Sequence, residues 1–308
     1  QDDMIAVNAY DPEMMTGDGG DVCNINIANI SRNGLGKGGA VRVWSSSGSE
    51  STTTTNVTVS NVTDRGTTDV GAVNIGFSGD SFDKHRNVSV RGVRSKDHRA
   101  VQISGSNRGL GIEDIGAINA DDVIRVSRSV SAMSINDVAG IDCDNVIKIG
   151  GTATLSTCTI RGVRGEVLNG VQNSVINVVS GELLQGVTIS DVSFYDDNTN
   201  VTVFDFDGDA TDLNISNVNA RKVDTVFDMT GSVDGQVSGV NVGSGTAYAA
   251  TSDLRFDPTC PAFDSPPANV TGSMPIATSS WDPDSDGNGE VVIADGANWN
   301  EVADMPNI

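Results

Sequence analysis

A six-residue phrase recurs along most of the chain, and it constrains the fold more than any other feature of the sequence. The phrase reads apolar-x-apolar-x-(Asn, Asp or Gly)-apolar, as in INIANI, VTVSNV and LGIEDI. Its copies begin at Ile25, Val57, Val88, Leu110, Met133, Cys158, Val187 and Leu213, with a weaker copy at Gly235. Successive copies start 22 to 32 residues apart, which is the length of one supersecondary unit. The chain therefore repeats a single unit, and the longer intervals indicate inserted loops.

Alternation within the phrase predicts a β-strand that bends at its fifth residue. The first and third residues would face the same side of the strand, and Asn, Asp and Gly enter the left-handed conformation at the lowest cost. A second apolar strand follows in each repeat, as in GAVRVW, RAVQIS and TVFDF. Stacked repeats would pair each strand in parallel with its counterpart and enclose a continuous core. The sequence thus predicts an all-β fold, a right-handed parallel β-helix of about nine to ten turns.

These repeats resemble the pectate-lyase-like superfamily of parallel β-helix proteins over about residues 1–250. The resemblance implies a fold but no single activity, because lyases, hydrolases, adhesins and virus spikes share that architecture.

The distribution of proline indicates a boundary near the C-terminal end. No proline stands between Pro12 and Pro258, as expected where strands need their backbone donors, whereas seven prolines lie from Pro258 to Pro306. We expect a β-helix over 1–257, a proline-rich linker over 258–272 and a small, hairpin-like C-terminal β module over 273–308. This tail is similar to the small β modules that end many virus tail-fibre and tail-spike proteins.

The charge balance indicates adaptation to high salt. The chain has 41 acidic and 19 basic residues, a net charge of −22, and only five of the basic residues are lysines. At very high salt the Debye length falls to a few ångströms, about 3 Å at 1 M, which removes most of the self-repulsion of such a surface. The same charge argues against nucleic-acid binding, which needs Lys and Arg for the phosphates. No run of 18 apolar residues is present, so no membrane span is expected.

Four cysteines are scattered along the chain, at Cys23, Cys143, Cys158 and Cys260, and form no CxxC motif. Cys23 and Cys158 fall on positions that the alternation assigns to the core. Buried free thiols are therefore expected at these two positions, with a disulfide as the alternative.

The second strand of each repeat predicts a polar ladder on the outer face of the helix. The residue between each inward-facing pair must point outward, and these residues are Ala6, Arg42, Asn74, Gln102, Arg125 and Lys148, followed after an unassigned turn near 166–173 by Asp205, Asp228 and Tyr248. At about 4.8 Å per turn, an extended glycan could lie along Arg42, Asn74, Gln102, Arg125 and Lys148. The alternative is that any outward strand face is polar.

A basic stretch interrupts the acidic chain. Residues 84–108 contain Lys84, Arg86, Arg91, Arg94, Lys96, Arg99 and Arg108, together with His85 and His98. This stretch indicates contact with an acidic partner, an anionic polysaccharide or another chain, or else a set of surface ion pairs.

The N-terminal stretch DDMIAV resembles the GDDCIAI-type strand of polygalacturonase-like glycoside hydrolases, whose Asp pair supplies the general acid and base. The resemblance would assign those roles to Asp2 and Asp3, and would place Arg42 of GGAVRVW on the family's substrate-binding Arg. The family's GHG motif and its upstream acid are missing, however. Two neighbouring carboxylates also cannot by themselves provide the separation of roughly 6.5–9.5 Å that inverting chemistry requires. The sequence therefore favours a non-catalytic protein.

The segment DPDSDGNGE has the alternating acids of a calcium-binding turn. Asp282, Asp284, Asp286 and Glu290 could present oxygens to one calcium ion around a glycine-permitted bend. Position twelve is Ile293 instead of the bidentate Glu of an EF-hand, and a solvated acidic turn is the alternative. No other cofactor is indicated.

Together these features predict a non-catalytic virion surface protein, a tail spike, fibre or turret-like component of a haloarchaeal virus. Its expected partners are host cell-surface glycans or glycoprotein, other virion proteins and further copies of itself, with a trimer implied by the spike resemblance. A secreted polysaccharide hydrolase or lyase of the polygalacturonase-like type is the alternative. A haloarchaeal cell-surface adhesin is a third reading, and all three place the protein outside the cell or on the virion surface.

Overall fold

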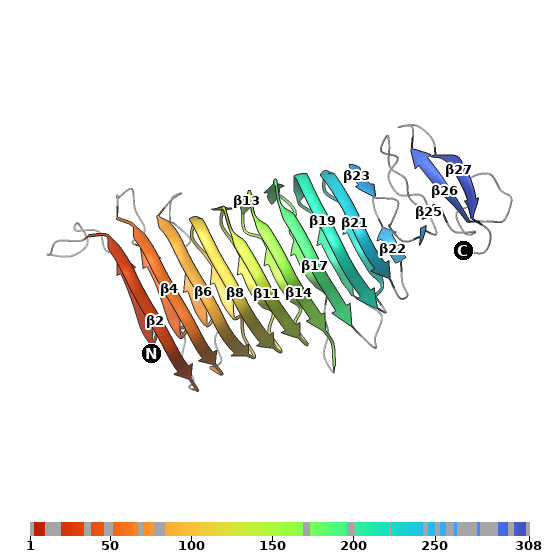
Figure 1. Cartoon of the computed structure of the whole chain (residues 1–308). Coiled ribbons are helices and arrows are strands. Elements are labelled where there is room, and N and C mark those ends of the chain that lie inside the picture. Colours follow the sequence, from red (N-terminus) through yellow and green to blue (C-terminus); the bar gives the residue numbers. More distant parts are fainter. Residues whose placement is uncertain are drawn as a thin grey trace.

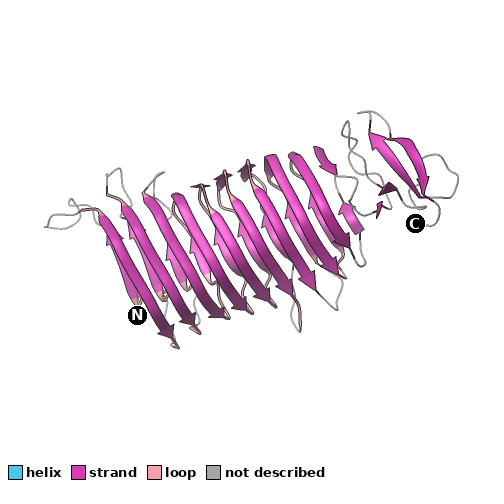
Figure 2. Ribbon diagram, in the orientation of Figure 1, coloured by secondary structure: helices cyan, strands magenta, loops and turns pink. Residues whose placement is uncertain are grey.

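The computed structural model describes most of the chain between Asp3 and Met305. Residues 1–2, 10–19, 34–37, 46–51, 67–69, 77–83, 169–172, 196–200, 222, 243–245, 250–252, 257–261, 264–275, 278–288, 295–298 and 306–308 lie outside the described residues, and from residue 242 onward only the backbone is described. The described part is all-β and contains no helix (Figure 2).

Two parallel sheets run along the length of the repeat region (Figure 1). We call the first the short-strand sheet. Its ten strands, in spatial order, are β1 (Ile5–Ala9), β3 (Val41–Ser45), β5 (Val73–Ile75), β7 (Val101–Ile103), β9 (Asp122–Val126), β12 (Asn145–Ile149), β15 (Ser174–Val178), β18 (Thr202–Phe206), β20 (Thr225–Met229) and β22 (Thr246–Ala249). Each strand pairs in parallel with the equivalent strand of the next repeat, so the parallel β-helix predicted from the sequence is confirmed.

The second sheet, the long-strand sheet, contains the six-residue phrases. Its main strands are β2 (Val22–Arg32), β4 (Thr54–Asp64), β6 (His85–Lys96), β8 (Asn107–Ile118), β11 (Ser134–Ile141), β14 (Thr159–Glu166), β17 (Thr188–Tyr195), β19 (Asp209–Arg221), β21 (Val233–Val242) and β23 (Asp253–Phe256). Three short strands, β10 (Val130–Ser131), β13 (Thr154–Ser156) and β16 (Leu183–Gln185), lie where the long strands of neighbouring coils begin.

The fifth residue of every phrase adopts the left-handed conformation, as predicted. The nine φ angles lie between 54° and 67°, at Asn29, Asn61, Gly92, Asp114, Asp137, Gly162, Asp191, Asn217 and Gly239. These positions are aligned from one coil to the next, so every long strand bends at the same point along its length. A second left-handed row stands just before eight of the nine phrases, all but the weaker copy at Gly235, and there Ala132 and Thr157 have φ angles of 53° and 55°. Such angles are unfavourable for alanine and more so for a β-branched residue.

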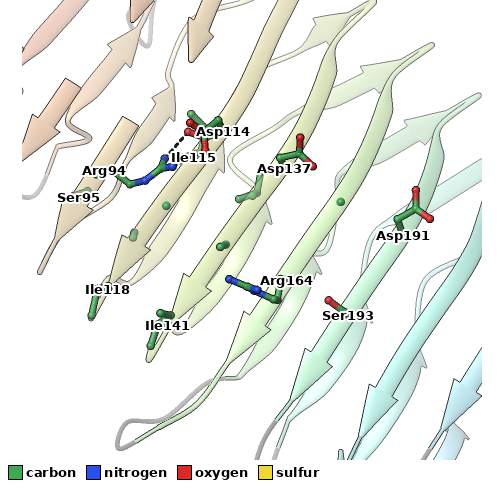
Figure 3. Close-up of a pocket in the computed structure, with 15 residues that line it drawn as sticks. Arg94, Ser95, Asp114, Ile115, Ile118, Asp137, Ile141, Arg164, Asp191 and Ser193 are labelled. Carbon is green, nitrogen blue, oxygen red and sulfur yellow. Dashed lines mark hydrogen bonds and ion pairs between the residues drawn. The ribbon is translucent and has the colours of Figure 1, made fainter. Parts of the chain in front are cut away.

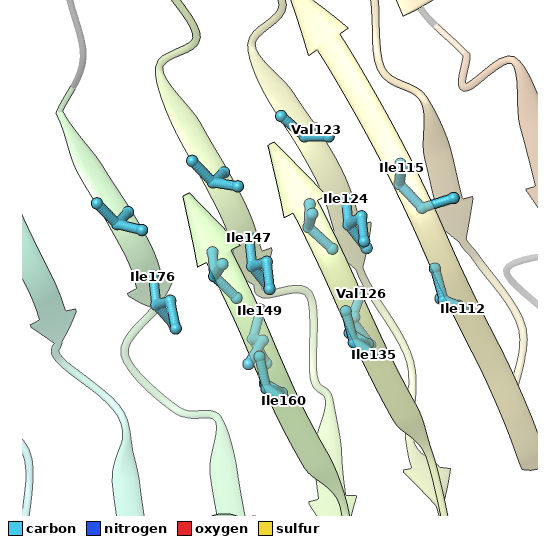
Figure 4. Close-up of a cluster of buried hydrophobic side chains, with 14 of the residues drawn as sticks. Ile112, Ile115, Val123, Ile124, Val126, Ile135, Ile147, Ile149, Ile160 and Ile176 are labelled. Carbon is cyan, nitrogen blue, oxygen red and sulfur yellow. The ribbon is translucent and has the colours of Figure 1, made fainter. Parts of the chain in front are cut away.

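The core is a set of apolar columns along the helix (Figure 4). Ile124, Ile147 and Ile176 follow one another in the short-strand sheet, and Ile135 and Ile160 do so in the long-strand sheet. All five side chains are fully buried. Farther along the first column, the rings of Phe204 and Phe227 stack with centroids 5.0 Å apart. The alternation in the sequence therefore identified the core correctly.

The described residues contain fewer complete turns than predicted. About six coils run without a gap from a short strand through the following long strand, against the predicted nine to ten. The other strand pairs are separated by residues outside the described part. The unassigned turn near 166–173 contributes β15, which begins one residue later, at Ser174.

Four strands form a separate sheet near the C-terminus, β24 (Ala262–Phe263), β25 (Ile276–Ala277), β26 (Gly289–Ala294) and β27 (Trp299–Met305). β26 and β27 pair antiparallel. The expected linker at 258–272 lies mostly outside the described residues, and β24 falls within it.

Cys143 and Cys158 are buried free thiols, whereas Cys23 is exposed. Burial raises the pKa of the Cys143 thiol to about 11, so this side chain is unreactive. The prediction of a buried Cys23 was wrong, because the left-handed Asn24 breaks the alternation before Ile25. Cys23 consequently aligns with Thr55, on the outward row.

Candidate ligand-binding surfaces

The outward residues of the short-strand sheet form one continuous row. In register they are Ala6, Arg42, Asn74, Gln102, Arg125, Lys148, Asn177, Asp205 and Asp228. Asn177 was missed because its strand follows the unassigned turn. Tyr248 was misplaced, since it pairs with the inward Phe227 while Ala249 pairs with Asp228.

Many polar groups in this row are occupied by neighbouring side chains. Gln102 accepts a hydrogen bond of 3.0 Å from Arg99 and donates one of 2.9 Å to Ser104. Asn177 donates to Asp205 at 2.6 Å. A row whose donors and acceptors are already paired offers a ligand fewer hydrogen bonds than the sequence suggested.

Asp3 is held by structural contacts. Its carboxylate lies 2.9 Å from Nε of Arg42 and accepts a hydrogen bond of 2.8 Å from the amide of Gly39. The side chain is only 4% exposed, and the Arg42 guanidinium lies 5.2 Å from the centroid of the Trp44 ring. A carboxylate fixed by an arginine and a backbone amide is poorly suited to accept or deliver a proton. Asp2, the other member of the predicted pair, lies outside the described residues.

Two carboxylates at the far end of the row are adjacent. Asp205 and Asp228 are register partners on β18 and β20. Burial and neighbouring acids raise the pKa of both, although Asn177 and Lys148 partly offset the effect at Asp205. A carboxyl with a raised pKa can act as a general acid, which makes this pair the best catalytic candidate among the described residues.

The basic stretch from 84 to 108 is partly internal. Lys84, His85 and His98 are buried. Arg94 forms an ion pair with Asp114, and Arg99 pairs with Asp122 at 3.1 Å. These contacts agree with the ion-pair alternative for part of the stretch, whereas Arg91, Lys96 and Arg108 are exposed, so contact with an acidic partner stays a prediction.

His98 belongs to a buried charge network that the sequence did not reveal. Asp64 Oδ1 lies 2.8 Å from Nε of Arg32, and Asp64 Oδ2 lies 3.2 Å from Nε2 of His98. Burial would raise the pKa of Asp64, but hydrogen bonds from His98, Arg32 and the Gly66 amide lower it to about 2.

The outer face of the long-strand sheet carries a groove of about 570 Å³ (Figure 3). Its floor is open because two small residues, Gly116 and Ala139, stand between Arg94 and Arg164 in one register row. The Arg94 side chain lies over Gly116, where a Cβ would come within 3.3 Å of its Cδ. The groove is lined by Arg94, Ser95, Asp114, Ile115, Gly116, Ala117, Ile118, Asp137, Val138, Ala139, Ile141, Gly162, Arg164, Asp191 and Ser193.

A smaller hollow of about 150 Å³ adjoins this groove and shares Arg164 and Ser193 with it. We call it the tyrosine hollow, and its lining is Arg164, Ser193, Phe194, Tyr195, Asn219 and Arg221. Tyr195 is 50% exposed. The sequence contained one signal for it, an outward-facing tyrosine at the end of a strand in a chain with only three tyrosines.

The predicted calcium site stays a prediction. Asp282, Asp284 and Asp286 lie outside the described residues, and for Glu290 only the backbone in β26 is described. Within the described residues, no group of three or more His, Cys, Asp or Glu side chains is placed to hold a metal ion.

No family model matches the chain, and neither a curated protein nor a solved structure does. The structure shows the parallel β-helix architecture, and the resemblance to the pectate-lyase-like superfamily stays an expectation from the sequence repeats. None of the elements described here is a helix of the length and apolarity that a membrane span would require.

Proposed function

We propose that the protein is a non-catalytic virion surface component of a haloarchaeal virus, a spike, fibre or turret-like rod that binds glycans of the host surface. The observation that carries this proposal is the groove on the long-strand sheet together with the adjoining tyrosine hollow. Both are shallow, lie on one face of a rigid stack of strands, and run across several coils. Such a surface suits an extended chain of sugars better than a compact small molecule.

The contacts of Asp3, one member of the predicted catalytic pair, support a binding role over hydrolysis. Asp3 is bound by Arg42 and the Gly39 amide. Releasing it for catalysis would leave the Arg42 charge without its carboxylate partner.

The composition supports an environment of high salt. A net charge of −22 on 308 residues costs little when salt screens it. The host surface would meet the rod under the same conditions, so contacts of short range, such as stacking and hydrogen bonds, would provide most of the binding.

Antibodies raised against the chain test the virion assignment directly. We expect them to label virus particles and to block adsorption of those particles to haloarchaeal cells. Labelling of the envelope of uninfected cells, with no labelling of particles, would refute the virion assignment and support the adhesin alternative.

The adjacent acids Asp205 and Asp228 favour a second candidate function, a polysaccharide hydrolase. Neighbouring positions in a parallel ladder are about 4.8 Å apart, close to the carboxyl separation of about 5–5.5 Å found in retaining glycosidases. The test is release of reducing ends from acidic polysaccharides by the wild-type chain and by Asp205→Asn, Asp228→Asn and Asp3→Asn. Activity that disappears in Asp205→Asn and Asp228→Asn but survives in Asp3→Asn would establish this function and its site.

A further inference from the structure

We propose that the tyrosine hollow binds an oligosaccharide unit that carries a carboxylate or sulfate group, with the neighbouring sugars lying in the groove. This inference rests on the proposed glycan-binding function and names the site and the class of ligand. It places the site on the long-strand sheet, whereas the polar ladder suggested by the sequence lies on the short-strand sheet.

The strand register brings two arginines to either side of one tyrosine. Ser193 and Tyr195 belong to β17, which lies between β14 and β19. Arg164 on β14 is in register with Ser193, and Arg221 on β19 is in register with Tyr195. Neighbouring strands are about 4.8 Å apart, and Arg221 stands two residues farther along its strand than the row of Arg164, so the two backbones are separated diagonally by about 12 Å. A single sugar unit fits between them.

The charge of the hollow suits an anion. No ion pair or hydrogen bond within the described residues holds Arg164 or Arg221, and no carboxylate lines the hollow. Two other outward arginines of the same sheet are neutralised, since Arg94 pairs with Asp114 and Arg161 pairs with Asp191 at 2.7 Å. Guanidinium groups bind planar oxyanions through two parallel hydrogen bonds.

The surrounding chain makes this local positive charge unusual. From residue 191 onward the sequence has 20 acidic residues and three basic ones, of which Arg221 is one. The nearest acid in the register rows is Glu166, which pairs with Tyr195 but does not line the hollow. Two arginines without an ion pair among the described residues would attract an anionic ligand to this part of an acidic chain.

The remaining lining provides the contacts that a sugar needs. The half-exposed Tyr195 ring presents an apolar surface for the C–H face of a pyranose and a hydroxyl for its rim. Ser193 and Asn219 lie in the same row and offer both donors and acceptors to hydroxyl groups. Figure 3 shows Arg164 and Ser193 at the edge of the groove, so a ligand in the hollow can continue across Ala139 and Gly116.

Calorimetric titration of the full chain tests the inference. The probes are oligogalacturonate, which carries carboxylates, a chondroitin sulfate oligosaccharide, which adds sulfates, a neutral malto-oligosaccharide and poly-glutamate. We expect binding of at least one acidic sugar, with roughly tenfold weaker affinity in Arg164→Ala, Arg221→Ala and Tyr195→Ala. Arg91→Ala removes an exposed arginine of the same sheet that lines neither the groove nor the tyrosine hollow, and it should leave the affinity unchanged. Affinity should also fall as the salt rises from about 0.15 M to about 1 M.

Three results would overturn the inference, and they separate it from the proposed function. Binding of an acidic sugar that all three hollow variants retain would remove this site but keep the glycan-binding function. Preference for the neutral sugar, or equal binding of poly-glutamate, would remove the ligand class. Absence of binding to any sugar at either salt concentration would count against both proposals. Thermal unfolding of each variant, unchanged from wild type, confirms that the fold is intact.

Discussion

The carboxylate of Asp64 lies 2.8 Å from Nε of Arg32, and both side chains are buried between successive coils of the long-strand sheet. The other Asp64 oxygen faces His98 Nε2 at 3.2 Å, while His98 Nδ1 lies 2.8 Å from the carbonyl oxygen of Lys96. Each ring nitrogen of His98 therefore lies near an acceptor oxygen. One carboxylate thus contacts both the Arg32 guanidinium and the His98 ring.

Replacing this carboxylate should destabilise the protein strongly. In Asp64→Asn the charge of Arg32 stays buried without an anionic partner, a situation that typically costs about 3–5 kcal/mol. We expect a loss of that size in the free energy of unfolding, measured by denaturant titration. Asp114→Asn breaks an exposed arginine pair of the same sheet and should cost less than about 1 kcal/mol. Equal losses in the two variants would contradict the assigned role of Asp64.

The same carboxylate gives a predicted pH dependence. Its pKa is lowered from 3.8 to about 2, so its contribution to stability is complete above pH 3.8 and is lost as the pH falls towards 2. Protonated Asp64 has the shape and charge of the Asn variant. The difference in unfolding free energy between wild type and Asp64→Asn should therefore narrow by roughly 2 kcal/mol between about pH 5 and pH 2. A constant difference across that range would show that the pKa is not lowered.

The sequence predicted the fold well because periodicity reports directly on parallel stacking. The apolar pairs of the short strands and the left-handed fifth residues follow from alternation and from the preference of Asn, Asp and Gly for positive φ. The prediction of a buried Cys23 failed because Asn24, which lies between Cys23 and the phrase that begins at Ile25, also adopts that conformation. The alternation within one repeat cannot show such a bend, which becomes visible only when the residues just before the phrase are compared between repeats.

The candidate sites were harder to predict, since they depend on neighbours that lie a full coil apart in the sequence. Asp3 and Arg42 are 39 residues apart and form an ion pair only after one coil has closed. The groove results from the small residues Gly116 and Ala139, which have no functional group that would mark them as a site in the sequence. The sequence therefore identified polar groups, but not which of them other side chains neutralise.

A strained position offers a stabilising substitution. Thr157 has a φ angle of 55°, and a left-handed conformation costs a non-glycine residue about 1–2 kcal/mol. Asparagine tolerates this conformation, so Thr157→Asn should raise the free energy of unfolding by about 1 kcal/mol. The matched control is Thr159→Asn, at an exposed position in the regular part of β14, where the change should be neutral or destabilising. A gain of the same size at both positions would exclude relief of backbone strain as the cause.

At the acidic end of the short-strand sheet, removing the charge of Asp228 should also stabilise the fold. Burial and the nearby Asp207 raise the pKa of Asp228, so the charged form is less favourable in the folded state. A raised pKa contributes stability only while the group is protonated, and that contribution is lost as the pH rises through the folded-state pKa. We therefore expect Asp228→Asn to unfold at a higher temperature than wild type at pH 7. The advantage should disappear below about pH 3.8, where Asp228 is itself neutral.

Varying the salt concentration distinguishes the two causes of the raised pKa of Asp228, burial and repulsion from Asp207. Repulsion from Asp207 is screened at about 1 M NaCl, whereas the cost of burial is not. Asp207→Asn provides the matched variant, since it removes the neighbouring charge and leaves Asp228 in place. If repulsion dominates, Asp207→Asn should stabilise as much as Asp228→Asn at low salt and both gains should vanish at high salt. We expect burial to dominate, because it is the larger cause of the raised pKa of Asp228, and the gain from Asp228→Asn should then persist at high salt and exceed that from Asp207→Asn. Thermal unfolding at two salt concentrations distinguishes these outcomes, and a destabilised Asp228→Asn at pH 7 would contradict the raised pKa itself.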